Sequence, residues 1–487
     1  MSARHIGLTV FWLWACLAAA AAQADDNTLA AAAGFSPDKT AAAAPEDETR
    51  PPKRLEQNWR AGILVNRYGY QKSSPLNPNR YSTPLRRTER AAILSSRTQI
   101  RLHQQISATV NGVASSGRGN VFTDKDPKAP KYAWGNVFDG ENARVLEAYV
   151  SFSDADKMQH LILGKQKIRW SQDSTFHPFD IFGRYNQDKN TIGLNEYDPY
   201  QQEGPLLVRQ QGSYRALSWD LVYADARKNL FRRGNRQAAL KVDARWKSTE
   251  ISALVEKTSG YKVRSGGAIS QGIGDNWGFY AEFLHAGERT LPVPELVSPP
   301  VQTAPDFSLP AVYRLGLPDA DNARPANQIL FTLRRSINGI GNIETSYFHN
   351  QNGYTRREWD RLAALAASAE STYIDPAYLA FYPGKDANPH GEFLGALATL
   401  SKHQYLRRKY VGLRLDTLEN WRFARLESNF IYNAEDRSST SSITLRKTIF
   451  DNAMLNIFGA YSAGPGDSEA QLSPMRTSIG TYFQWDF

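Results

Sequence analysis

The chain has 487 residues and carries 58 Lys and Arg against 49 Asp and Glu, a formal net charge of +9. Such a basic excess suits a nucleic-acid binder only as a patch on a soluble scaffold. Here the charges are dispersed and alternate with apolar residues, so we exclude nucleic acid as a partner. The only cysteine, Cys16, lies in an N-terminal apolar stretch, so we expect a mature chain without disulfides or cysteine-ligated metals.

The first 24 residues have the features of a secretory signal peptide. Arg4 begins a short positive region, Ile6 to Leu17 is apolar, and Ala22-Gln-Ala24 is an A-x-A cleavage site. The apolar stretch is too short for a spanning helix, which needs about 20 residues. Lipidation of Cys16 is the alternative. Cleavage near Ala24 would remove one basic residue and leave a predicted net charge of +8, from 57 basic and 49 acidic residues.

The rest of the chain divides into a short leader and one large domain. Residues 25–57 contain two alanine runs, acidic residues and a Pro-Pro pair without periodicity, which predicts a disordered periplasmic leader. Residues 58–487 remain for a single domain.

From Trp59 onward, apolar and polar residues alternate in segments of strand length. In lipid every backbone polar group must be bonded within the protein, and no later segment is apolar enough for a spanning helix. The pattern therefore predicts an all-β fold, a transmembrane antiparallel up-and-down β-barrel of 16 to 18 strands. The expected strands lie near 59–69, 87–96, 98–113, 144–153, 160–170, 204–212, 215–226, 237–247, 249–258, 262–271, 277–286, 327–336, 340–350, 406–418, 422–433, 443–450, 453–461 and 476–487.

The last strand has the clearest pattern. Its apolar face consists of Ile479, Thr481, Phe483, Trp485 and Phe487, and its polar face of Ser478, Gly480, Tyr482, Gln484 and Asp486. Such a strand has lipid on one side and water on the other, with aromatics where membrane meets water. An edge strand of a soluble sandwich is the alternative. A terminal strand ending in Phe resembles the signal that the barrel-assembly machinery reads. We therefore expect the Gram-negative outer membrane, with its lipid and lipopolysaccharide as partners.

Connection lengths support this arrangement. Those assigned to the periplasm are short, such as Asp451-Asn452, whereas 171–203, 287–326 and 351–405 are long and assigned outside. In the last of these, Thr355 and Glu358 form a capping box, which predicts a short helix. This loop either folds into the barrel and narrows it or covers the mouth as a lid.

Alternation also assigns the side chains that face the lumen. A cation on the lipid face at the bilayer midplane costs about 2–4 kcal/mol, so the charged face of each strand must point inward. In 160–170 this places Ile162, Ile168 and Trp170 against lipid. The predicted pore-lining residues are Lys165, Lys167, Arg169, Lys241, Asp243, Arg245, Arg334, Arg408, Arg414, Arg425 and Glu427.

The basic excess allows three interpretations: loops that bind lipopolysaccharide phosphates, a ladder of Arg–Glu pairs across the lumen, or an anion-selective pore. Rings of Arg or Lys favour anion passage. We favour a passive, porin-like channel for hydrophilic and small anionic solutes. The alternatives are an export pore for an acidic polysaccharide and a barrel-rim enzyme or adhesin.

One hairpin resembles a known superfamily. Leu146-Glu-Ala-Tyr-Val-Ser-Phe152 followed by Leu161-Ile-Leu-Gly-Lys-Gln-Lys-Ile-Arg-Trp170 is similar to the hairpin shared by porin-like and alginate-export-type barrels. Phe176-His-Pro-Phe-Asp-Ile-Phe182 and Gln202-Glu-Gly-Pro-Leu-Leu207 are similar to a segment of porin-like relatives. The resemblance implies transport without an energy source. In the polysaccharide exporters it also implies an arginine-rich lumen.

Signals for enzymatic chemistry are weak. Gly466-Asp-Ser468 and Gly272-Ile-Gly-Asp-Asn-Trp-Gly278 lack the strand–helix context of a nucleophile elbow and of a dinucleotide fingerprint. His103, His285 and His349 could face a barrel rim, but nothing in the sequence pairs them. The histidines show no metal-ligand spacing. We expect no enzyme activity, no cofactor and no metal.

Overall fold

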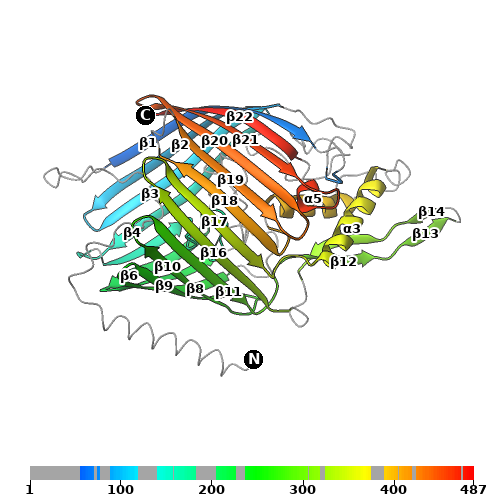
Figure 1. Cartoon of the computed structure of the whole chain (residues 1–487), viewed down its shortest axis with the longest axis horizontal. Helices are drawn as coiled ribbons and strands as arrows, with labels where there is room; N and C mark the ends of the chain where they lie inside the picture. The colour runs from blue at the N-terminus through cyan, green and yellow to red at the C-terminus, as the bar shows by residue number, and fades with distance from the viewer. Residues whose placement is uncertain are drawn as a thin grey trace, which may run out of the picture.

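The computed structural model describes residues 55–70, 74–76, 88–118, 140–156, 158–182, 204–225, 236–304, 307–317, 324–374, 389–403, 405–418, 424–472 and 475–487. The expected signal peptide and nearly all of the expected leader lie outside these residues. The main element is an 18-stranded antiparallel sheet that closes on itself, as predicted (Figure 1). Its strands are β1 (Leu55–Tyr70), β2 (Thr88–His103), β3 (Ile106–Arg118), β4 (Gly140–Ser153), β5 (Gln159–Lys165), β6 (Leu206–Tyr214), β7 (Leu217–Asp225), β8 (Arg236–Trp246), β9 (Thr249–Thr258), β10 (Arg264–Ile273), β11 (Trp277–Ala286), β16 (Ala326–Ile337), β17 (Gly341–Asn350), β18 (Lys409–Thr417), β19 (Arg425–Asn433), β20 (Ser438–Phe450), β21 (Ala453–Ala463) and β22 (Met475–Asp486).

The first and last strands close the barrel. β1 pairs with β22 from Arg60↔Asp486 to Tyr70↔Met475, and Arg60 Nε lies 3.0 Å from Asp486 Oδ1. Closure leaves no unpaired strand edge in lipid. The side chain of Trp485 is exposed on the outer face, whereas Gln484 is buried inside. The alternation predicted for the terminal strand is therefore confirmed.

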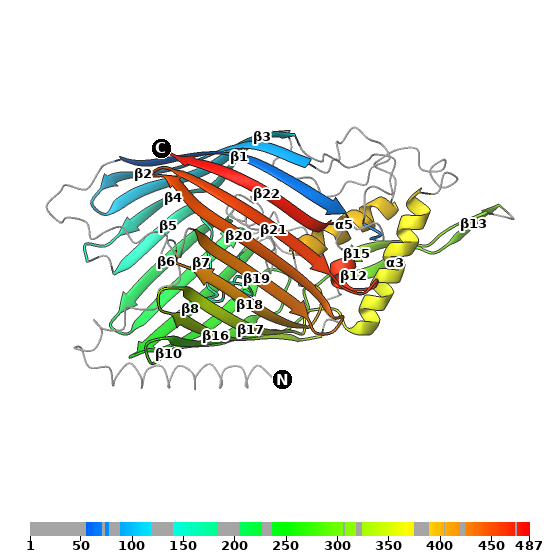
Figure 2. The same cartoon turned by 45° about the horizontal axis from the view of Figure 1, so that its top comes forward.

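Connections at the two ends of the barrel differ in length. At the end where β22 finishes, strands are joined by short turns such as 215–216, 247–248 and 451–452. The opposite end carries the helices and the additional hairpins (Figures 1 and 2). In outer-membrane barrels the short turns are periplasmic and the long loops extracellular. Several boundaries differ from the prediction. β1 starts at Leu55, within the expected leader, and β20 starts at Ser438. β2 continues to His103, so its turn is 104–105 and β3 is Ile106–Arg118, and β5 ends at Lys165.

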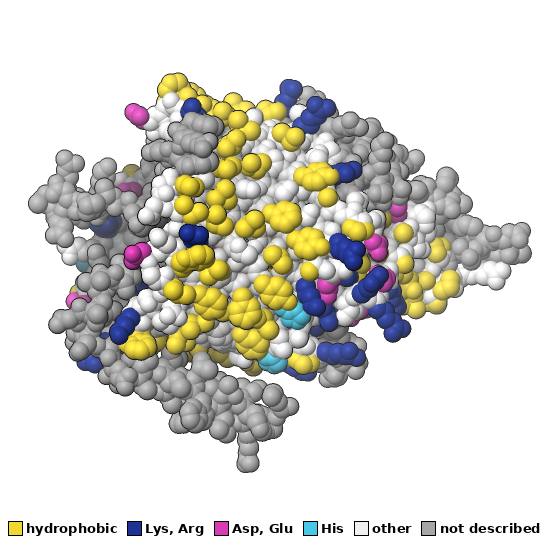
Figure 3. Space-filling model, viewed as in Figure 1, with side chains coloured by type: hydrophobic (Ala, Val, Ile, Leu, Met, Phe, Trp, Pro, Cys, Tyr) yellow, Lys and Arg dark blue, Asp and Glu magenta, His cyan; other side chains and the backbone are white. Residues whose placement is uncertain are grey.

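The outer face of the barrel carries an apolar band (Figure 3). Outward-facing side chains such as Leu163, Phe283, Phe331, Leu413 and Ile457 are all more than a third exposed. In water such a surface would be a liability, but in lipid it is the expected solvent-facing surface. At the periplasmic rim three cations stack on exposed aromatic rings, in the pairs Arg215–Tyr214, Lys247–Trp246 and Arg335–Trp277. Aromatics at this level are typical of an interfacial girdle.

Among the described residues, no helix is both long and apolar enough to cross a membrane.

An extracellular cap with its own core stands over the mouth of the barrel (Figure 2). It is formed by α3 (Arg356–Ile374), α5 (Pro389–His403), α6 (Glu469–Leu472) and the small sheets β12 (Val293–Ser298)–β15 (Val312–Gly316) and β13 (Val301–Ala304)–β14 (Phe307–Leu309). Leu76, Leu291, Trp359, Leu397 and Leu472 meet in its core, each no more than 5% exposed. Four separate connections thus fold together as one cap, with the predicted helix as part of a lid.

The predicted capping box starts α3. The Thr355 backbone N donates to Glu358 Oε2 at 2.8 Å, and the Glu358 N donates to Thr355 Oγ1 at 3.3 Å. Burial opposes ionisation of Glu358, but these hydrogen bonds and the charge of Arg289 outweigh it and lower the pKa of Glu358. In α5, burial alone lowers the pKa of His390 to about 4. His390 is therefore neutral within the cap near pH 7.

Candidate functional site

The chain leaves the barrel wall after β5 and enters the lumen. Residues 166–182, here called the inward segment, carry six buried apolar side chains that pack against the inner face of the sheet. These are Ile168, Trp170, Phe176, Phe179, Ile181 and Phe182. A segment lying inside a barrel reduces its open cross-section. It is therefore the part of the described structure best placed to select solutes.

An aromatic cluster holds the middle of the inward segment. Phe176 is fully buried, and its ring centroid lies 5.0 Å from that of Phe348 on β17 and 5.0 Å from that of Tyr405. Gly412 on β18 makes room for it, since a Cβ there would lie 2.9 Å from Phe176 Cε2. Any larger residue at 412 would push against this ring. Gly266 on β10 similarly admits Phe179, with a Cβ position 2.9 Å from Phe179 Cε1.

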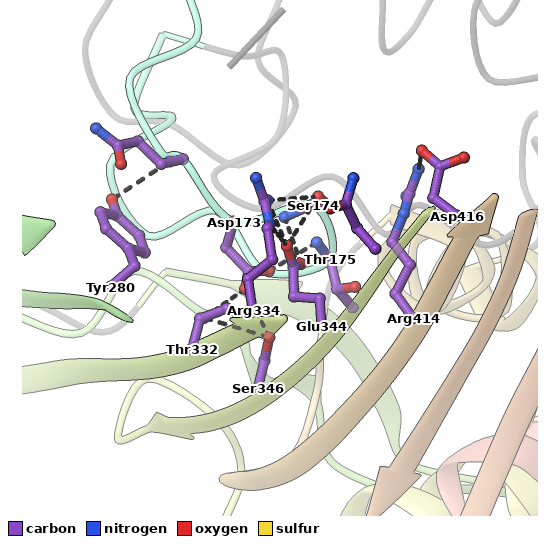
Figure 4. A network of polar contacts seen from close by, with 12 residues as sticks. Asp173, Ser174, Thr175, Tyr280, Thr332, Arg334, Glu344, Ser346, Arg414 and Asp416 are labelled. Carbon is purple, nitrogen blue, oxygen red and sulfur yellow. Dashed lines mark hydrogen bonds and ion pairs between the residues drawn. The ribbon is translucent and has the colours of Figure 1, made fainter. Parts of the chain in front are cut away.

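Asp173 joins the turn of the segment to the wall (Figure 4). Its Oδ1 accepts the backbone N–H groups of Thr175 at 2.7 Å and Phe176 at 2.6 Å. Its Oδ2 accepts the hydroxyls of Thr332 on β16 at 2.5 Å and Ser346 on β17 at 2.6 Å. A buried carboxylate is tolerated only when its oxygens are hydrogen-bonded, and this one has four donors. Asp173 therefore fixes both the local conformation and the position of the segment.

The next residue makes a second tether. The Ser174 backbone N donates to Glu344 Oε1 at 3.1 Å, and the Ser174 hydroxyl to Glu344 Oε2 at 3.3 Å. Arg334 completes the group, with its Nε 2.9 Å from Glu344 Oε2 and a shorter contact from its Nη2 (Figure 4). The side chain of Glu344 is buried, whereas that of Arg334 is partly exposed to the lumen.

Further hydrogen bonds spread the attachment along the wall. Trp170 Nε1 donates to Asp220 Oδ2 at 2.8 Å, and the Ser171 hydroxyl donates to Glu282 Oε2 at 2.9 Å. At the far end the carbonyl of Ile181 accepts from Gln237 Nε2 at 3.0 Å. Thr175 Oγ1 donates to Asn429 Oδ1 on β19 at 3.4 Å, so the contacts of the segment extend from β7 to β19. It is therefore a fixed part of the barrel.

Most predicted pore-lining cations are paired with carboxylates. Lys241 Nζ lies 2.6 Å from Asp243 Oδ1, and Arg245 Nη2 lies 2.9 Å from Glu250 Oε2. Arg425 Nη2 lies 2.9 Å from Asp416 Oδ2. The other pairs are Arg334–Glu344, Arg414 with Asp416 and Glu427, and Arg425–Glu427. The Arg–Glu ladder is thus present, and the pairing is more complete than the sequence indicated.

The inward assignment made for 160–170 is wrong for its strand part. Ile162 is 6% exposed and belongs to the inner core, whereas Leu161 and Leu163 are each 39% exposed on the outer face. Lys165 pairs in register with Leu206, which is also exposed outside, so Lys165 belongs to the outer face. The inward face had been inferred from Lys167 and Arg169, which lie beyond the end of β5, where the alternation of a strand no longer holds. Ile168 and Trp170 likewise lie inside and not against lipid.

Lys167 and Arg169 nevertheless lie in the lumen, as part of the inward segment. Arg169 Nε is 3.5 Å from Asp180 Oδ2. The charges of Lys167, Arg169 and Arg414 all act on the buried ring of His177. Three of the predicted cations therefore lie at the inward segment. Lys167 and Arg169 reach the lumen because the chain leaves the wall after β5, and not because they alternate along a strand.

The remaining candidates lie apart. Arg408 precedes β18, and its Nε donates to the carbonyl of Gly353 at 3.1 Å, at the extracellular end. His103 ends β2 at the periplasmic side, whereas His285 and His349 lie near the extracellular ends of β11 and β17. Within the described ranges, no three His, Cys, Asp or Glu side chains are grouped to hold a metal ion.

Comparison with known proteins relates this geometry to a fold. No family model matches the chain, and no curated protein matches it. The crystal structure of a BenF-like porin from Pseudomonas fluorescens Pf-5 is similar, with a TM-score of 0.51 and 8% identity over 89% of this chain and 98% of that one. Acinetobacter baumannii OccAB1 gives a TM-score of 0.48 and 10% identity over 89% and 96%. At such identities the likeness concerns the fold alone. With its closed 18-stranded barrel and apolar outer band, the chain has the fold of Gram-negative outer-membrane porins and is a protein of that membrane.

Proposed function

We propose that this protein is a passive, water-filled channel for hydrophilic solutes, with a preference for small anions. The porin fold and the inward segment support a channel with a fixed constriction. A passive channel needs only a polar path and a selective narrow part, and the wall and the inward segment are suited to these two roles.

The anion preference is supported by the difference in exposure between the cation and the carboxylate of an ion pair. In two pairs at the inward segment, the cation is more exposed than its carboxylate: 44% against 17% for Arg169–Asp180 and 27% against 4% for Arg334–Glu344. The order is reversed for Lys241–Asp243 and for Arg414 with Asp416 and Glu427, so the preference depends on Arg169 and Arg334. Arg245–Glu250 and Arg425–Asp416 follow the order of Arg169–Asp180. A pair that is neutral overall thus presents its positive end to water. A passing solute meets the guanidinium first, and that favours anions.

Two alternatives use the same features less well. An export pore for an acidic polysaccharide would use the same exposed arginines. The resemblance of the 146–170 hairpin to alginate-export-type barrels implies such an arginine-rich lumen. The inward segment, anchored along much of the wall, favours small solutes over a polymer chain. A rim enzyme or adhesin would act outside the lumen, where the described histidines are not brought together.

The test is the ion selectivity of the purified chain in planar bilayers. We expect Arg169→Gln combined with Arg425→Gln to lower anion preference. A unit charge about 5 Å from the ion path contributes about 0.8 kcal/mol at the dielectric constant of water, which is roughly a fourfold change in local anion concentration. The reversal potential in a KCl gradient should move toward that of a cation-selective channel.

Arg356→Gln with Arg357→Gln is the matched control. It removes the same charge from exposed positions at the start of α3, outside the lumen. Heat-modifiable gel mobility verifies that each variant is folded. If the lumen pair keeps the wild-type selectivity, or if the control pair changes it equally, the exposed arginines do not set selectivity and the anion preference is refuted.

A further inference from the structure

The contacts of the inward segment described above end one strand short of β20. The last of them joins Thr175 to Asn429 on β19. Asn429 lies directly opposite Ser442 on β20, the next strand of the wall (Figure 1). Because the segment packs against the wall as far as β19, the remaining passage lies on the other side of the lumen, which begins at β20. A solute that passes the inward segment therefore moves along β20.

The inner face of β20 carries a line of hydroxyl groups. Ile443 is 48% exposed on the outer face, so alternation points Ser442 and Thr444 into the lumen. Thr440 lies on the same inner face, and its hydroxyl is 3.3 Å from that of Ser462 on β21. Within the described residues, the hydroxyls of Ser442 and Thr444 bond to no protein group, so they can donate to and accept from a solute. We call Thr440, Ser442 and Thr444 the hydroxyl row.

The hydroxyl row ends at a cation. Arg446 is the next inward-facing residue of β20, and it lies directly opposite Arg425 on β19. Like charges in directly opposite positions destabilise a sheet. Arg425 is held by Asp416 and Glu427, whereas the partner of Arg446 is neutral, since its Nε donates to Asn456 Oδ1 at 3.0 Å. Among the described acids, none lies within ion-pair distance of Arg446, so its positive charge is left for a solute.

Beyond β20, the inner face offers fewer free polar groups. Phe458 on β21, Tyr482 on β22 and Leu64 on β1 are buried in an apolar cluster. The polar side chains near them are bonded within the wall: the Ser478 hydroxyl donates to Asn66 Oδ1 at 3.0 Å, and both residues are buried. A solute on this side of the lumen therefore finds its polar contacts mainly along β20.

We propose that the hydroxyl row and Arg446 form a subsite for a hydroxylated monoanion, such as a sugar acid. One cation without a described carboxylate partner matches one negative charge. Successive inward-facing positions of a strand are about 7 Å apart, so neighbouring hydroxyls of the row can bond to one small solute whose acidic end lies at Arg446. The proposal rests on the proposed channel function and adds to it a choice among anions. It makes Ser442 and Thr444 specificity-determining residues.

The experiment compares gluconate with hexanoate, which have the same charge and the same number of carbon atoms but differ in hydroxyl groups. Reversal potentials of the purified full chain in planar bilayers, measured against chloride, give the permeability of each anion. We expect Ser442→Ala combined with Thr444→Val to lower the ratio of gluconate to hexanoate permeability about tenfold, because hydrogen bonds to the solute hydroxyls are lost. The removed hydroxyls bond to no described protein group, so the variant should fold, which heat-modifiable mobility verifies. Arg446→Gln should instead lower the permeability of both anions.

Ser439→Ala combined with Ser441→Ala is the matched control, because these serines alternate with the hydroxyl row and lie on the outer face of the same strand. An unchanged ratio in the hydroxyl-row variant, an equal drop in the control, or an Arg446→Gln channel that passes both anions as the wild type does would overturn the subsite. The reversal potential in KCl tests the channel function separately. A wild type without anion preference in KCl refutes that function, whereas a normal anion preference with an unchanged gluconate ratio refutes the subsite alone.

Discussion

Replacing Asp173 should release the inward segment from the barrel wall. The Asp173 carboxylate accepts two hydrogen bonds from the wall, one from the hydroxyl of Thr332 and one from that of Ser346. Both are hydrogen bonds to a charged group. Bonds of this kind contribute about 1.5–3 kcal/mol each, so Asp173→Ala removes about 3–6 kcal/mol of attachment. At 1.4 kcal/mol per decade, this shifts the balance between the seated and the released segment by roughly two to four decades.

Other anchors remain in that variant, including the Phe176 cluster and the Ser174–Glu344 bonds. We therefore expect transient release and not complete loss of the constriction. In planar bilayers the Ala variant should show a higher mean conductance and more open-channel noise. In liposome-swelling assays it should admit larger neutral sugars than the wild type.

The control is Asp173→Asn, which makes the same change in charge but keeps the shape and one acceptor oxygen. The hydroxyls of Thr332 and Ser346 can rotate to accept from its amide. If attachment matters, the Asn variant should stay near the wild type while the Ala variant leaks. Equal effects in both would mean that charge alone is responsible. Unchanged conductance and sugar exclusion in the Ala variant would refute the role of the segment as the constriction.

Two further predictions concern the seat of the segment and the cap. Gly412→Val should raise open-channel noise as Asp173→Ala does, because the added side chain would collide with Phe176, and overpacking of this kind costs about 1–3 kcal/mol. Unchanged noise in Gly412→Val would contradict the close contact between Gly412 and the Phe176 ring. His390 has a pKa lowered to about 4 in the folded cap against about 6.5 when unfolded, so its contribution is complete above pH 6.5 and is lost as pH falls toward 4, by up to about 3 kcal/mol. The free energy of opening of α3 and α5, obtained from hydrogen exchange after correction for the pH dependence of the intrinsic rate, should therefore fall between pH 6.5 and 4, and His390→Gln should flatten that dependence.

The sequence predicted the wall well because one physical rule governs it. Lipid outside and water inside impose a period of two, and that period identified the faces of β22 and the sides of β8. Some ion pairs were also accessible in principle. Arg334 and Glu344 flank a short turn, and hairpin register places them opposite each other.

The inward segment was not predicted, because no local periodicity describes a chain that crosses a lumen. Its tethers join residues far apart in sequence, such as Asp173 and Ser346, and these depend on closure of the whole barrel. One signal was available. The run from Phe176 to Phe182 has three phenylalanines and an isoleucine in seven residues, which is too apolar for a loop exposed to water. Such a run between two strands should be expected to bury itself, and in this barrel the lumen is where it does so.

Anchoring and selectivity depend on the same side chains in this lumen. Besides aromatic packing, buried hydrogen bonds fix the segment to the polar wall, and their main acceptors are carboxylates such as Asp173 and Glu344. Using these acids as anchors turns their negative charge away from the open lumen. Arg334, the arginine partner of Glu344, is left facing water. A lumen whose described cations are mostly paired can thus present a positive path. Its selectivity should respond to substitutions of the exposed arginines more than to the number of charges in the wall.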